Sequence, residues 1–106
     1  EPRQITPGAP EMDENVCLSD GPAPLRDVLW LTGQSGVAMT LATDQPGMQL
    51  FDGRWVVRPG RGTYEGLAFE AQHWPDAPTH ADFPSIRVTE EAPYRQFTTF
   101  TFARPA

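Results

Sequence analysis

Residues 66–78 read Gly-Leu-Ala-Phe-Glu-Ala-Gln-His-Trp-Pro-Asp-Ala-Pro. The first half of this stretch places an apolar residue at every second position, namely Leu67, Phe69 and Ala71, with Glu70 between two of them. Side chains point alternately to the two faces of a β-strand. The stretch therefore predicts a short strand with an apolar face and a face that carries Glu70. The Pro-rich second half predicts a turn.

The rest of the chain also consists of short apolar runs separated by turn residues. Twelve Pro and nine Gly interrupt the 106 residues at short intervals, and no window keeps a helical period. Gly33-Gln34-Ser35-Gly36 predicts a hairpin turn. The expected strands are Asn15–Leu18, Val28–Thr32, Val37–Thr43, Gln49–Phe51, Leu67–Gln72, Ile86–Val88 and Tyr94–Phe102. This spacing predicts an all-β fold, an antiparallel β-sandwich.

Composition limits the classes of partner. The net charge of −6 argues against nucleic acid, because phosphate binding needs clustered positive charge. No stretch is long and apolar enough to span a membrane. The lone Cys17 excludes an internal disulfide and favours a reducing compartment, so we expect a cytoplasmic protein. Its Val-Cys-Leu context predicts a buried, inert thiol. The basic cluster of Arg54, Arg58 and Arg61 predicts a solvated loop.

Several stretches together resemble the aldose 1-epimerase (galactose mutarotase) family. Its members carry a Glu–x–Gln–(His or Asn)–aromatic–Pro–Asp–Ala stretch, which residues 66–78 match, then Phe-Pro and an aromatic- and Thr-rich last strand, which Phe83-Pro84 and Tyr94–Phe102 match. Upstream, residues 43–51 resemble the family's Thr-Thr-Gln-Pro-Gly-x-Gln-x-aromatic segment, and residues 12–18 its Asp-His-x-aromatic-x-Leu segment. Glu14 stands where the family commonly has His, which leaves the identity of the sugar open.

The resemblance implies the C-terminal part of a galactose-mutarotase-like supersandwich that interconverts the α and β anomers of a free aldose without a cofactor. It implies that Glu70 is the general base and that Asp13 and Gln45 bind sugar hydroxyls. Phe51 and Trp74 are candidates for an apolar wall against the sugar, although core packing explains them equally well. The two His and one Cys lack the spacing of metal ligands, so no metal site is expected.

Family members are far longer, and the resemblance places the general acid, a His, and a sugar-binding Arg in motifs that have no counterpart here. We therefore expect residues 1–106 to be the C-terminal portion of one larger β-sandwich domain, with 1–10 as a connecting segment. An N-terminal companion chain or segment would then pair with strands such as Val37–Thr43. For His73 and His80 we expect structural or surface roles. The alternative function is a non-catalytic carbohydrate-binding β-sandwich.

Overall fold

The chain folds into two antiparallel sheets of three strands each. The computed structural model describes residues 3–105. Within them, the first sheet has the order β1-β4-β5, and the second has the order β2-β3-β6. Their bounds are β1 Asp13–Cys17, β2 Arg26–Thr32, β3 Ala38–Thr43, β4 Gly47–Phe51, β5 Ala68–Gln72 and β6 Thr98–Ala103, with a 3₁₀ turn η1 at Ala77–Thr79. The predicted all-β class with antiparallel sheets is confirmed.

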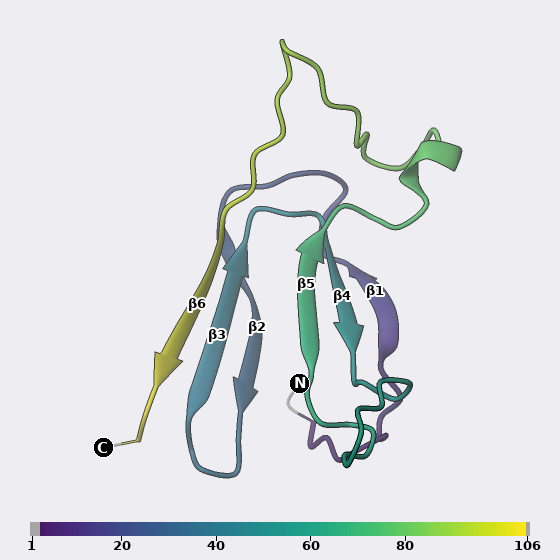
Figure 1. Cartoon of the computed structure of the whole chain (residues 1–106). Coiled ribbons are helices and arrows are strands. Elements are labelled where there is room, and N and C mark those ends of the chain that lie inside the picture. The colour runs from purple at the N-terminus through teal and green to yellow at the C-terminus, as the bar shows by residue number, and fades with distance from the viewer. Residues whose placement is uncertain (1–2, 106) are drawn as a thin grey trace.

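The two sheets stand next to each other and are joined where β3 runs into β4 (Figure 1). This connection, residues 44–46, is called the link below. The chain between η1 and β6 rises beyond the same end of both sheets (Figure 1). Among the described residues, no helix is long and apolar enough to cross a membrane.

The hairpin between β2 and β3 has the turn that its glycines predict. The Gly33 amide donates to the Val37 carbonyl at 3.0 Å, and the Gly36 amide donates to the Gly33 carbonyl at 2.9 Å. Gly36 has a φ of 87°, a conformation that side chains with a Cβ rarely adopt. The prediction of a turn at residues 33–36 is therefore confirmed.

Strand β3 is the central strand of its sheet. It pairs with β2 on one side and with β6 on the other, along its whole length. The expectation that a companion segment pairs with this strand is therefore wrong, because both of its edges are already occupied. The alternation along residues 37–43 predicts a strand, but it does not reveal which neighbours the strand has.

The best-buried residues lie at the end of β3, in the link and at the start of β4. Leu41, Thr43, Gln45 and Met48 are all almost fully buried. The link also ties distant segments together: the Leu18 amide donates to the Pro46 carbonyl, the Ala23 amide to the Asp44 carbonyl, and the Asp44 amide to the Phe97 carbonyl. The core is thus small, polar in part, and centred on the junction of the two sheets.

Two further expectations need correction. Residues 86–88 form no strand, because a strand persists only where a neighbour accepts its backbone hydrogen bonds, and Ile86–Val88 has no such neighbour in the described chain. Cys17 is exposed. It ends β1, an edge strand whose residues are mostly exposed on both faces, so the Val-Cys-Leu run does not bury it.

A buried carboxylate, that of Asp52, directly follows the last residue of β4. The Asp52 side chain is 3% exposed and pairs with Arg54 at 2.9 Å. Its Oδ2 also accepts from the Met12 amide at 3.4 Å, and its own amide donates to the Met12 carbonyl at 3.0 Å. Arg54 was expected in a solvated loop, but only 14% of its side chain is exposed, because Asp52 holds it there. Arg58 is exposed as expected and pairs with Glu65.

Candidate functional site

One face of the β1-β4-β5 sheet carries polar side chains on all of its strands. Asn15 lies directly opposite Gln49, and Gln49 lies directly opposite Glu70. Residues that are directly opposite in a sheet share a face, so these side chains form a row across the strands. By the same register, Asp13 on β1 and Gln72 on β5 lie on this face, on either side of the row. We call this surface the polar face; its members are Asp13, Asn15, Gln49, Glu70 and Gln72.

Side-chain hydrogen bonds connect the polar face across its strands. Gln49 Nε2 donates to Asp13 Oδ1 at 3.1 Å, and Gln72 Nε2 donates to Asn15 Oδ1 at 3.4 Å. The opposite face of the sheet carries Val16, Met48, Leu50, Phe69 and Ala71. The division into an apolar face and a face with Glu70, which the alternation in residues 66–78 predicts, is therefore present.

Glu70 lies in the middle of β5, an edge strand of its sheet, and its side chain is exposed. Within residues 3–105 it has no side-chain hydrogen bond and no ion pair. Glu14, which stands where the resembling family commonly has His, lies opposite Leu50 and so on the other face. The polar face thus offers the carboxylates of Asp13 and Glu70 to a ligand.

Aromatic side chains lie at both ends of the polar face. Phe51 is directly opposite Asp13, and its ring stacks on Trp55 with 6.1 Å between centroids. At the other end, a Cβ on Gly47 would come within 3.0 Å of Trp74 Cδ1, so the indole occupies the space that a side chain would need. Trp74 Nε1 donates to the Pro46 carbonyl at 3.0 Å, which fixes the ring there.

Gln45 is enclosed in the link, and its amide is paired at both ends. Nε2 donates to Asp44 Oδ1 at 2.9 Å. Oε1 accepts from the Tyr94 hydroxyl at 3.1 Å and lies 3.1 Å from His73 Nδ1. Of the site residues expected from the sequence, the structure brings Asp13, Phe51, Glu70 and Trp74 to the polar face or its ends. Gln45 instead contacts His73 and Tyr94.

His80 lies apart from these groups. Its Nε2 is 3.2 Å from Asp76 Oδ2, and its ring stacks on Phe83 with 4.3 Å between centroids. Asp76 precedes η1 in a left-handed conformation, with a φ of 62°. In the described part of the chain, no three His, Cys, Asp or Glu side chains are placed to hold a metal ion.

Sequence reasoning missed several groups of the site. Asn15 follows Asp13 by two positions, and Gln49 precedes Phe51 by two positions. Because side chains two positions apart in a strand share a face, alternation predicts that each of these pairs lies on one face. Nothing in the sequence signals that Tyr94 contacts Gln45, because the two residues lie 49 positions apart, with β4 and β5 between them. The expected strand Tyr94–Phe102 is shorter at its start, because residues 94–97 form no strand and β6 begins only at Thr98.

The known proteins that this chain resembles include two galactose mutarotases. Over 98 residues, the chain is 28% identical to a galactose mutarotase of Rattus norvegicus and 26% identical to a galactose mutarotase of Mus musculus. The chain is distantly similar to galactose mutarotases. Each match covers 86% of this chain but only 29% of the relative, so the chain spans less than a third of the length of the curated relatives it matches. No family model matches it.

Proposed function

We propose that this chain forms part of an aldose 1-epimerase-like isomerase, which interconverts the α and β anomers of a free aldose. The observation that carries the proposal is the row of Asn15, Gln49 and Glu70 on the polar face, next to Asp13. Amides and carboxylates in a row offer the donors and acceptors that vicinal sugar hydroxyls need. The similarity to galactose mutarotases supports the same class of reaction.

In this proposal Glu70 is the general base. Its carboxylate removes the proton of the anomeric hydroxyl while an acid protonates the ring oxygen, and the bond between the anomeric carbon and the ring oxygen breaks. The open-chain aldehyde rotates, and the ring oxygen attacks the other face of the carbonyl. Glu70 then returns its proton to the new anomeric oxygen, and the acid recovers the proton of the ring oxygen. The reaction is proton-neutral and needs no cofactor.

The other groups bind the sugar. Asp13 accepts hydrogen bonds from hydroxyls, while Phe51 and Trp74 provide apolar walls at the two ends. Gln45 stays a proposed hydroxyl-binding residue, although its paired amide also supports an indirect role through His73. The acid, a His, and the sugar-binding Arg are proposed to come from an N-terminal companion segment of the same protein.

Replacing Glu70 with Gln tests the proposal, because the amide keeps size and hydrogen bonding but cannot accept the proton. In the intact protein, Glu70→Gln should lower the turnover number at least about 100-fold and change sugar affinity little. Polarimetry of freshly dissolved α-D-galactose measures the rate. Glu14→Gln is the matched control, since it removes a carboxylate from the opposite face of the same sheet. Wild-type turnover in Glu70→Gln would refute the assignment.

A second function, carbohydrate binding without catalysis, is favoured by one observation. The polar face presents carboxylates, amides and aromatic walls, but within residues 3–105 no histidine belongs to it. A binding module needs no acid. If the intact protein binds an aldose at this face, as shown by Asp13→Asn weakening the affinity, and yet does not accelerate anomerisation, this second function replaces the first.

A further inference from the structure

The Gln45 amide has only one orientation that satisfies its neighbours. Asp44 Oδ1 accepts from Gln45 Nε2 and, at 3.1 Å, from the Phe97 amide. Burial by itself would raise the pKa of Asp44, but these hydrogen bonds outweigh it and keep the pKa below its ordinary value. Asp44 is therefore a carboxylate, which only accepts hydrogen bonds. The NH₂ group of Gln45 must face it, and Oε1 must face His73 and Tyr94.

This orientation determines which nitrogen of His73 carries the proton. An amide oxygen only accepts hydrogen bonds, so the His73 Nδ1 that lies 3.1 Å from Gln45 Oε1 must be an N–H donor. Tyr94 fits the same scheme, because its oxygen accepts from Gln96 Nε2 at 2.6 Å and its proton is free to go to Gln45. In a neutral imidazole only one nitrogen is protonated. When His73 is neutral, its Nε2 therefore holds the lone pair.

The lone pair of Nε2 is open to a ligand. Every buried side-chain nitrogen and oxygen among the described residues has a hydrogen-bond partner. His73 Nε2 has no partner within residues 3–105, so it is not buried. His73 lines a hollow of about 420 Å³ together with Gln72, Tyr94, Pro93, Ile86 and other residues.

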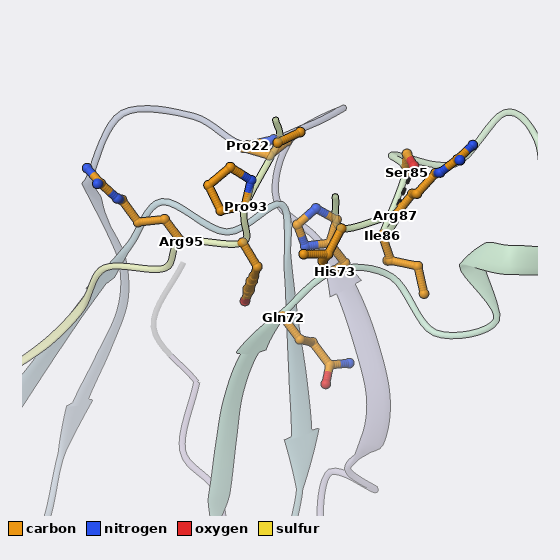
Figure 2. A pocket seen from close by; sticks show the side chains of 11 residues that line it. Pro22, Gln72, His73, Ser85, Ile86, Arg87, Pro93 and Arg95 are labelled. Carbon is orange, nitrogen blue, oxygen red and sulfur yellow. Dashed lines mark hydrogen bonds between the residues drawn. The ribbon is translucent and has the colours of Figure 1, made fainter. Parts of the chain in front are cut away.

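His73, Pro93 and Ile86 all line this hollow, and Figure 2 shows the imidazole of His73 between the other two side chains in this view. The guanidinium groups of Arg87 and Arg95 extend outward on opposite sides (Figure 2). The hollow thus combines apolar walls with a neutral acceptor, and its cations are directed elsewhere. This combination fits an uncharged ligand with hydroxyl groups and apolar C–H faces, such as a sugar, better than an anion.

We propose that Asp44 and Gln45 hold His73 as the Nδ1–H tautomer, and that His73 Nε2 accepts a hydrogen bond from a hydroxyl of a carbohydrate bound in this hollow. His73 would then be a specificity-determining residue at the end of the polar face, because Gln72 immediately precedes it and belongs to that face. The carbohydrate part of this inference rests on the proposed function. The tautomer part does not.

Nitrogen NMR of the intact protein, labelled with ¹⁵N-histidine, tests the tautomer. At about pH 8, where an ordinary imidazole is neutral, His73 should show a protonated Nδ1 and an unprotonated Nε2. His80 is the internal reference and should show the reverse, because its Nε2 faces the acceptor Asp76 Oδ2. A protonated Nε2 in neutral His73 would overturn the inference.

Titration of the same sample with D-galactose tests the ligand. The His73 Nε2 resonance should move on binding, and failure of this resonance to respond overturns the carbohydrate part, whether or not the sugar binds elsewhere. The rates of Glu70→Gln judge the proposed function separately, because within residues 3–105 Glu70 makes no side-chain hydrogen bond to His73 or Gln45.

Two substitutions separate the ligand role of His73 from a structural role. In His73→Asn, the side-chain NH₂ overlies Nδ1, so the bond to Gln45 is retained and only the acceptor is lost. His73→Gln reaches toward the position of Nε2 but gives up the bond to Gln45. We expect His73→Asn to keep wild-type stability and to weaken D-galactose binding about three- to tenfold, as for one hydrogen bond. Unchanged affinity in His73→Asn would show that His73 acts only through Gln45.

Discussion

Gly47 leaves room for two side chains of the candidate site. A Cβ at this position would lie 2.9 Å from Asn15 Oδ1, 3.0 Å from Trp74 Cδ1 and 3.1 Å from the Gln72 carbonyl oxygen. The amide of Asn15 can rotate away, but the Gln72 carbonyl belongs to the backbone of β5 and the Trp74 ring is held by Pro46. The absence of a side chain at residue 47 is therefore a requirement of the site.

We predict that Gly47→Ala lowers the free energy of unfolding by about 1–3 kcal/mol, because the extra methyl group overpacks this position. Urea denaturation measures the change, and tryptophan fluorescence should report a displaced Trp74. Gly21→Ala is the control, since a Cβ on Gly21 would have no atom within 4 Å. If Gly47→Ala is as stable as Gly21→Ala, the close approach of Trp74 to β4 is not the packing that the protein has in solution.

At the scale of elements, Asp52 joins the end of β4 to the residue before β1. The hydrogen bond from the Arg54 side chain, and to a lesser extent the Met12 amide and the charge of Arg54, lower the pKa of Asp52 against the effect of burial. The folded state thus binds the proton of Asp52 more weakly than the unfolded chain does. Such a group stabilises the fold above its unfolded pKa, near 3.9, and that contribution is lost as the pH falls through the folded pKa.

Asp52→Asn should therefore lower the urea midpoint at neutral pH, and the gap to the wild type should narrow as the pH falls below about 4. The midpoints of both proteins, measured across the acid range, give the comparison. Asp20→Asn removes the carboxylate of an exposed side chain and should shift the midpoint little at any pH. A gap between wild type and Asp52→Asn that stays constant down to acid pH would contradict the ion pair with Arg54.

The sequence predicts strands better than it predicts how they pair. Alternation locates β3 and β5, and the glycines of residues 33–36 locate the hairpin, because these signals are local. The pairing of β1 with β4, which creates the polar face, depends on segments far apart in the chain. For the same reason the sequence indicates Glu70 and Asp13 but not the contact of Gln45 with His73. Ile86–Val88 has the composition of a strand and lacks a neighbour to pair with.

At the scale of the whole molecule, the apolar face of the β2-β3-β6 sheet is incompletely covered. Leu31, Met39 and Phe102 share this face, as do Leu41 and Phe100. Phe100 is 51% exposed and Phe102 is 64% exposed. Large exposed apolar patches mark interaction surfaces. This exposure supports the proposal of an N-terminal companion segment, and it moves the expected contact from the edge of β3 to the face of the sheet.

We predict that residues 1–106, purified alone, anomerise an aldose no faster than a buffer blank. Glu70 is the proposed base, but His73 is proposed as a hydrogen-bond acceptor and not as an acid, and His80 pairs with Asp76 away from the polar face. Without a positioned acid, only water can protonate the ring oxygen. Polarimetry gives the rate, and addition of the N-terminal part should restore it. Catalysis by the isolated chain would contradict this, and His73→Ala and His80→Ala would then identify the acid.

The link between β3 and β4 also has a consequence for how the molecule unfolds. In the link, the backbone of Asp44 bonds to Ala23 and Phe97, which precede β2 and β6, whereas the backbone of Pro46 bonds to Leu18, which follows β1. Gln45, buried between Asp44 and Pro46, contacts both groups of segments, because its side chain bonds to Asp44 and lies 3.1 Å from His73, which follows β5. We therefore expect the two sheets not to open as independent units. Opening of either one exposes the buried junction, so loss of structure spreads from one sheet to the other in a single cooperative step.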